Sequence, residues 1–135
     1  MSENVTLVRK SFEAMCEWDV DGLLRLYAAD VEFLPLTGTR VETGGYQGHD
    51  GVRAYFEEAR DLWDVLEPEG VEYQDLGDRV LVAGRCRVRG RASGAESNPA
   101  CAWVIDVRDG KISRHRTCVD FDEALEIARA ATARE

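Results

Sequence analysis

The feature that most constrains the fold is the stretch CAWVIDVRDGKISRHRTCVD at residues 101–120. Asp109 and Gly110 separate two runs in which apolar and polar residues alternate. An Asp-Gly pair in this setting is a strong signal for a β-hairpin with a two-residue turn. Such a turn also fixes which residues face each other, so a regular hairpin places Trp103 opposite Arg116. The chain is therefore expected to build an antiparallel sheet near its C-terminal end.

Successive side chains of a strand point to opposite faces, so this register sorts the hairpin into an apolar face and a wetter face that includes His115. Three charged residues fall on the apolar face, and burying unpaired charges is costly, so they either pair, line a wet cavity or lie at the sheet margin. A β-bulge after Ser113 would exchange the two faces and remove the conflict. The predicted apolar face carries Cys101, Trp103, Ile105, Val107, Ile112, Arg114, Arg116, Cys118 and Asp120.

The segments before this hairpin predict helices followed by further strands. Apolar residues at helical spacing predict a helix over residues 3–18, a short helix capped by Asp19, and a third helix over residues 50–64. Val31 and Phe33 share one face of a short strand. Two more strands joined by a Gly-Asp turn, the last hairpin and a C-terminal helix complete the chain. Helices followed by an antiparallel meander indicate an α+β fold.

Composition narrows the class of protein. The chain has 135 residues, and we expect residues 1–135 to form a single domain. Its formal net charge of -9 argues against nucleic acid and anionic membranes as partners. No apolar run approaches a membrane span, and the first residues lack an apolar signal core, which predicts a cytoplasmic protein. Four cysteines without CxxC spacing indicate thiols rather than a zinc site, so we expect no metal and no cofactor.

Several segments together are similar to one known family: LLRLYAADVEFLP, YQGHDGVRAYFEE, DLGDRVLVAGRCRVRGRASG and WVIDVRDGKISRHRTCVDFDEAL. Because of the order and spacing of these segments, the chain resembles a SnoaL-like member of the nuclear transport factor 2-like superfamily, which shares its fold with ketosteroid isomerase. The resemblance implies a cone: a strongly curved antiparallel sheet wrapped around the N-terminal helices, with a pocket inside and a C-terminal helix. It also implies a homodimer that packs through sheet faces, and a small-molecule ligand.

The chain departs from the isomerases of that superfamily. Where they carry a carboxylate base, this sequence reads FLPLTG, without an acid. Asp106 points to the wetter face in the predicted register, so no second acid is found on the apolar face of its strand. Isomerase chemistry of that type is therefore not expected.

Asp120 and Arg116 are the predicted catalytic pair. The position of Asp120 resembles that of the final-strand carboxylate in cyclase-type relatives, where it would accept or donate a proton, and Arg116 would stabilise negative charge on a substrate oxygen. An alternative is open, because Asp120 and Glu123 have the spacing of a helix capping box.

The remaining predicted ligand contacts are mostly aromatic side chains. We expect the protein to bind a small, largely apolar, oxygenated molecule in its pocket. The sequence leaves two classes open: an acid–base enzyme of cyclase, isomerase, hydrolase or dehydratase type, or a non-catalytic dimeric ligand-binding or scaffold protein. The predicted ligand-binding residues are Tyr27, Phe33, Tyr46, Tyr55, Trp63, Trp103, Arg114 and Cys118.

Overall fold

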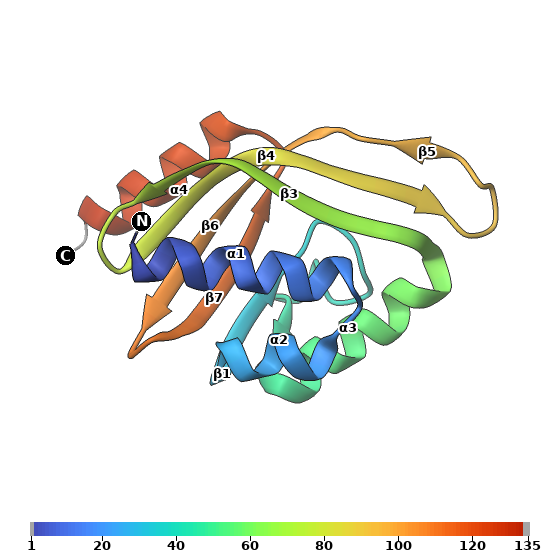
Figure 1. The fold of residues 1–135 in the computed structure, drawn as a ribbon, viewed down its shortest axis with the longest axis horizontal. Coiled ribbons are helices and arrows are strands. Elements are labelled where there is room, and N and C mark those ends of the chain that lie inside the picture. Colours follow the sequence, from blue (N-terminus) through green and yellow to red (C-terminus); the bar gives the residue numbers. More distant parts are fainter. Residues whose placement is uncertain (1, 134–135) are drawn as a thin grey trace.

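The computed structural model describes residues 2–133, with side chains described as far as Arg129. Figure 1 shows the course of the chain through four helices and seven strands. The first half contains α1 (Glu3–Cys16), α2 (Val20–Leu26), β1 (Tyr27–Leu34), β2 (Tyr46–Gln47) and α3 (Gly48–Leu62). The second half contains β3 (Trp63–Asp75), β4 (Arg79–Gly90), β5 (Glu96–Ser97), β6 (Ala100–Arg108), β7 (Lys111–Cys118) and α4 (Phe121–Ala133).

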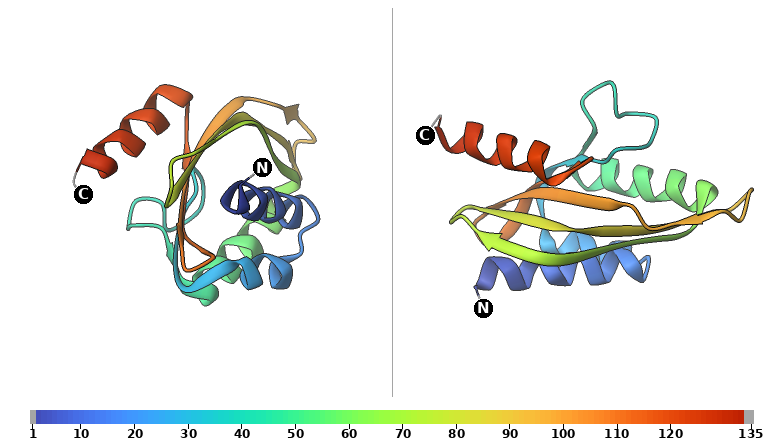
Figure 2. Two further views of the ribbon diagram at one scale, coloured as in Figure 1. Left: turned by 60° about the vertical axis from the view of Figure 1, so that its left-hand side comes forward. Right: turned by 90° about the horizontal axis from the view of Figure 1, so that it is seen from above.

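The strands form one curved sheet in the order β2-β1-β7-β6-β4-β3, with β5 paired to β4. Its pairings are antiparallel except that between β1 and β7, which is parallel. The sheet bends around α1, while α4 lies on the opposite side of the sheet (Figure 2). The predicted α+β fold, with N-terminal helices inside a curved, mostly antiparallel sheet, is confirmed.

The main core lies between the helices and the inner face of this sheet. The apolar stripe of α1 is buried through Val8 and Phe12, and that of α3 through Val52 and Phe56. The Phe12 ring meets Trp103 of β6 at a centroid distance of 4.9 Å. Because burying a large apolar side chain contributes about 1.5–3 kcal/mol, this inner layer holds the helices against the sheet.

The third helix ends earlier than predicted. Residue 63 was expected to continue the helix, but Trp63 is the first residue of β3, with an extended backbone (φ -127°, ψ 131°). Its strand pairs with β4 over nearly its whole length, from Trp63 opposite Gly90 to Asp75 opposite Val80. Pairing with a neighbouring strand overrides the helical pattern of apolar residues here.

The turn of the last hairpin is as predicted. Asp109 and Gly110 both adopt positive φ angles, 53° and 75°, as a two-residue turn with the twist of the sheet requires. Arg108 faces Lys111 directly beside the turn.

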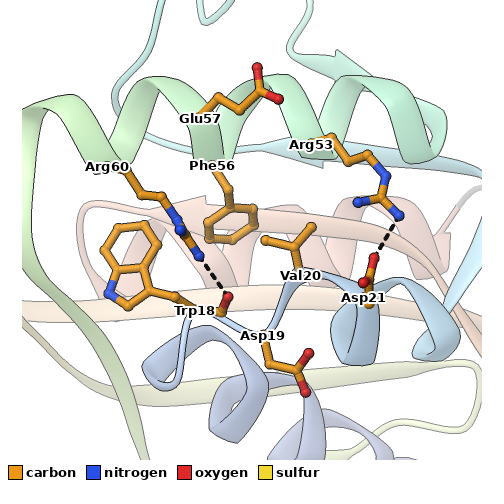
Figure 3. A pocket seen from close by; sticks show the side chains of 8 residues that line it. All are labelled: Trp18, Asp19, Val20, Asp21, Arg53, Phe56, Glu57 and Arg60. Carbon is orange, nitrogen blue, oxygen red and sulfur yellow. Dashed lines mark hydrogen bonds and ion pairs between the residues drawn. The ribbon is translucent and has the colours of Figure 1, made fainter.

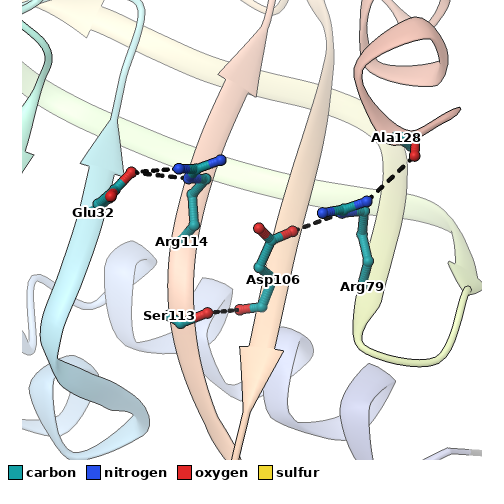
Figure 4. Close-up of polar contacts among 6 residues, drawn as sticks. All are labelled: Glu32, Arg79, Asp106, Ser113, Arg114 and Ala128. Atoms are coloured by element: carbon teal, nitrogen blue, oxygen red, sulfur yellow. Dashed lines mark hydrogen bonds and ion pairs between the residues drawn. The ribbon is translucent and has the colours of Figure 1, made fainter. Parts of the chain in front are cut away.

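One step further along, β7 contains a β-bulge at Ser113. Val107 pairs with Ile112, and the next pair joins Asp106 to Arg114, so Ser113 has no partner of its own. Its hydroxyl donates a hydrogen bond to the carbonyl oxygen of Asp106 at 3.3 Å (Figure 4). An extra residue on one strand shifts the alternation of side chains by one position.

From the bulge onward, every side chain of β7 lies on the face opposite to the predicted one. His115 lies opposite Ile105 and faces the inner core, whereas Arg116 lies opposite Val104 on the outer face. The predicted inward placement of Arg114, Arg116 and Cys118 is therefore wrong, and so is the outward placement of His115. The Arg114 guanidinium instead forms an ion pair with Glu32 of β1 at 2.8 Å.

Helix α4 covers part of the outer face. A second apolar cluster forms there, in which Ala124 packs with Val104 and Cys118, and Val104 is only 2% exposed. Beside it the Arg79 guanidinium pairs with Asp106 at 2.7 Å and donates to a carbonyl oxygen of α4 (Figure 4). The chain's own helix α4 thus covers Val104 on the outer face.

Within residues 2–133, none of the helices is long and apolar enough to cross a membrane.

Candidate functional site

A cavity of about 340 Å³ lies between the helices and the inner face of the sheet. The helices contribute Met15, Tyr55 and Phe56, and the final strands contribute Trp103 and His115. This volume lies at the lower end of the range for small-molecule sites, about 300–1,000 Å³. The size suits a molecule of one or two rings.

The wall of this cavity is mainly apolar. Among the side chains that the structure describes, no Asp, Glu, Lys or Arg lines it. An ionised group placed inside would lose its hydration without gaining a charged partner. The remaining wall consists of Phe33, Pro35, Leu36, Thr37, Trp63, Leu66, Pro68, Cys86, Val88, Pro99, Ala100, Cys101, Thr117 and Val119.

His115 is the most buried polar side chain in this wall, with 2% of its surface exposed. Its ring stacks on Phe33 with a centroid distance of 4.7 Å and an interplanar angle of 15°. Nε2 lies 3.5 Å from the hydroxyl oxygen of Thr117, while Nδ1 is buried without a hydrogen-bond partner among the described residues. A buried polar atom without a partner costs about 1–3 kcal/mol, so it needs an explanation.

Burial lowers the pKa of His115 from 6.5 to about 3, because the charged imidazolium would be deprived of water. The imidazole is therefore neutral at physiological pH, with one donor and one acceptor nitrogen. In this state His115 is suited to hydrogen bonding with a neutral oxygen group.

Tyr55 and the thiols of the wall are also neutral. Burial raises the pKa of Tyr55 to about 12 and that of Cys86 to about 12, and it raises the pKa of Cys101 as well. Thiols with raised pKa values are poor nucleophiles. Among residues 2–133 no group of three or more His, Cys, Asp or Glu side chains is placed to hold a metal ion.

Half of the predicted ligand contacts lie in this wall: Phe33, Tyr55, Trp63 and Trp103. The other predicted contacts lie elsewhere. The Tyr46 hydroxyl donates to Glu58 of α3 at 2.5 Å, and Tyr27 is buried in the core outside the cavity wall. Arg114 and Cys118 lie on the outer face because of the Ser113 bulge.

Asp120 and Arg116 do not share the cavity either. An Asp120 carboxylate oxygen accepts a hydrogen bond from the backbone N–H of Glu123 at 2.9 Å, and Glu123 in turn accepts from the backbone N–H of Val119 at 3.2 Å. The reciprocal bonds form a capping arrangement at the start of α4. The predicted geometry, with both side chains projecting into one cavity, is wrong: Asp120 serves the helix, and Arg116 lines a separate hollow on the outer face.

Sequence reasoning missed His115 as a cavity residue. Regular alternation assigned it to the wetter face, and only the bulge reverses that assignment. A signal was present in the sequence, since two arginines on an apolar face are improbable without a change of register.

A second hollow of about 340 Å³ is an open surface groove between the start of α2 and the outer side of α3 (Figure 3). Its cations are already engaged: Arg53 pairs with Asp21 at 2.7 Å, and Arg60 donates to the backbone carbonyl of Trp18 at 3.0 Å. Because both cations of this open groove already have partners, the apolar cavity is the better candidate site.

The comparisons with known proteins agree with this architecture. A nuclear transport factor 2-like protein of unknown function from Burkholderia pseudomallei superposes with a TM-score of 0.78 at 26% identity, covering 93% of this chain and 97% of that one. TerC co-crystallised with polyporic acid gives 0.77 at 24% identity, with coverages of 93% and 99%. A Mycobacterium tuberculosis protein in complex with estradiol-17β-hemisuccinate gives 0.75 at 20% identity, with coverages of 90% and 97%.

A search of curated protein sequences returned no match. The model of the SnoaL-like domain, in contrast, matches residues 8–115, most of the chain. That span contains the part of α1 that includes Met15, the whole of α3, and β7 as far as His115. The chain belongs to the SnoaL-like domain family.

Proposed function

We propose that this protein binds a small, largely apolar molecule that carries a neutral oxygen group, and that the oxygen group is recognised by His115. The observation that carries the proposal is the neutral imidazole of His115 in the wall of a cavity that is otherwise mainly apolar, with an Nδ1 that has no hydrogen-bond partner among the described residues. A ligand oxygen would give this imidazole a hydrogen-bond partner, while the aromatic wall would take up the apolar body.

Ligand binding is favoured over acid–base catalysis for a physical reason. A general acid or base works best when its pKa lies near the working pH. Among the described residues of the cavity wall, His115 has a pKa of about 3 and Tyr55 a pKa of about 12, both far from a physiological working pH. The cavity is better equipped to hold a molecule than to move its protons.

Two structural neighbours support the choice of ligand class. Polyporic acid and estradiol-17β-hemisuccinate, with which they were crystallised, are both ring compounds that carry oxygen groups. We extend only that shared chemistry to this chain: an apolar ring system with at least one oxygen.

The homodimer and the cytoplasmic location stay predictions. The chain's own α4 covers Val104, and His115 faces inward, so neither side chain is available for contact with a second copy.

The test uses 2-naphthol and naphthalene, which differ by one hydroxyl group. Trp63 and Trp103 lie in the cavity wall, so quenching of tryptophan fluorescence should report binding of either probe. We expect 2-naphthol to bind more tightly, because only it can pair with His115. The substitution His115→Phe should lower the affinity for 2-naphthol about fivefold to tenfold, corresponding to the ~1 kcal/mol of a typical hydrogen bond, and leave naphthalene binding nearly unchanged.

His49→Phe is the matched control, because His49 is the only other histidine and lies outside the cavity wall. It should leave both affinities as they are in the unsubstituted protein. Equal affinities of the two probes for the protein with and without His115 would contradict the proposal.

A further inference from the structure

A third and smaller hollow lies on the outer face of the sheet, next to the cavity wall. It measures about 240 Å³ and shares Pro35, Leu36 and Thr117 with the cavity wall. These residues follow or end the parallel strands β1 and β7, whose C-terminal ends lie at the same edge of the sheet. The two hollows therefore share part of their walls at that edge.

Arg116 lies in the wall of the outer hollow. It is half-buried, and none of the described side chains forms an ion pair or hydrogen bond with its guanidinium. Arg114, two residues earlier on the same face, is in contrast committed to Glu32 through contacts of 2.8 and 2.9 Å. A half-buried guanidinium has donors to spare and a strong preference for carboxylate oxygens.

The acids nearest to this hollow are directed elsewhere. Glu123 also lines it, but its carboxylate accepts the N–H of Val119, and Asp120 accepts the N–H of Glu123. Their negative charge weakens the attraction of Arg116 for an anion, so we expect a contribution of moderate size rather than a dominant one.

The cavity itself has no place for an anion, since no charged side chain of the described residues lines it. A ligand with both an apolar body and an ionised group must keep that group outside, where it stays hydrated or meets a cation. We propose that the outer hollow is a subsite for an anionic tail, such as a carboxylate, on a ligand whose apolar body fills the cavity, and that Arg116 determines this specificity. The inference rests on the proposed function, because it needs the body to bind in the cavity.

The experiment compares 6-phenylhexanoate with 6-phenylhexanol, which share an apolar body and differ in the charge of the end group. Binding is measured by calorimetry for the unsubstituted protein and for Arg116→Gln, Arg116→Lys and Arg114→Gln. In Arg116→Gln we expect the affinity for the acid to fall about fivefold, as for a partly exposed ion pair, while the affinity for the alcohol stays within about twofold.

Arg114→Gln is the matched control, because it removes the same charge from the same strand and face but from an arginine that already has a partner. It should leave the ratio of the two affinities unchanged, and Arg116→Lys should keep most of the preference for the acid. An acid-to-alcohol ratio that does not change in Arg116→Gln, while both probes bind, overturns the subsite alone. If neither probe binds the unsubstituted protein although 2-naphthol does, the subsite is overturned and the proposed function stands; if 2-naphthol does not bind either, both are overturned.

Discussion

The two faces of β7 differ sharply although they belong to the same strand. On the inner face His115 is almost fully buried and neutral, and it has one unpaired nitrogen. On the outer face Arg114 and Arg116 remain partly exposed, the first of them paired with Glu32. The inner face presents a weak, neutral hydrogen-bonding group to an apolar cavity, and the outer face keeps the charges where water and acids can reach them.

The difference depends on one residue. Ser113 is the extra residue of the β-bulge, and it decides which side chains of β7 face the cavity. With regular alternation the cavity would receive two guanidiniums in place of an imidazole and a hydroxyl. The bulge therefore determines the chemistry of the candidate site as well as the shape of the strand.

Deleting both Ser113 and Arg114 should have the largest effect. His115 would then take the outer position opposite Asp106, and Arg116 would turn into the apolar interior. Burying an unpaired charge costs several kcal/mol, a large part of the whole stability of a domain, about 5–15 kcal/mol. We expect this double deletion to lose its cooperative thermal transition, followed by circular dichroism at 222 nm.

The control deletes Ser113 alone. Arg114 would then follow Ile112 directly and still face Asp106, so every later side chain of β7 keeps its face, and this variant should keep a cooperative transition. A double deletion that melts as the unsubstituted protein does, and still binds 2-naphthol, would show that the register of β7 does not decide which face His115 occupies.

The fold could be predicted largely from local signals. The Asp109–Gly110 turn, the Asp19 cap of α2 and the apolar stripe of α1 all act over a few residues, and the structure contains each of them. The start of β3 at Trp63 could not be read in this way, because it depends on pairing with Gly90, a residue distant in the sequence.

The candidate site could be predicted only in part. Its aromatic wall followed from residues that any inward-facing core would contain, such as Phe33 and Trp103. Its polar group did not follow, because a single bulge inverts the whole strand after it. The conflict of charges on the predicted apolar face was the warning, and the bulge that resolves it lies at the position where the sequence allowed one.

The inner face can be tested through its pH dependence. His115 has a pKa of about 3 in the folded protein and an ordinary value of 6.5 when unfolded, so the unfolded chain binds a proton more readily. The stability contributed by the neutral, buried ring is complete above pH 6.5 and is lost as the pH falls toward 3. Between pH 6.5 and pH 5 this corresponds to about 2 kcal/mol in the free energy of unfolding.

Urea denaturation at several pH values measures that slope. In His115→Phe the loss between pH 6.5 and pH 5 should be smaller by about 2 kcal/mol, because the group that titrates is gone. If the free energy of unfolding changes with pH equally in the protein with and without His115, the pKa of this imidazole is not lowered in the folded state, contrary to what its burial predicts.

The outer end of β7 should give the smallest effect, through Asp120. Because its carboxylate caps α4 by accepting the N–H of Glu123, Asp120→Ala should lower the free energy of unfolding by about 1 kcal/mol, whereas Asp120→Asn should change it by only a few tenths. Neither change should alter the affinity for 2-naphthol, since Asp120 lies outside the cavity wall. Urea denaturation and fluorescence titration of the two variants separate stability from binding. An Asn variant that stays stable but loses 2-naphthol binding would show that the Asp120 carboxylate takes part in ligand binding, because asparagine keeps the cap and removes only the charge.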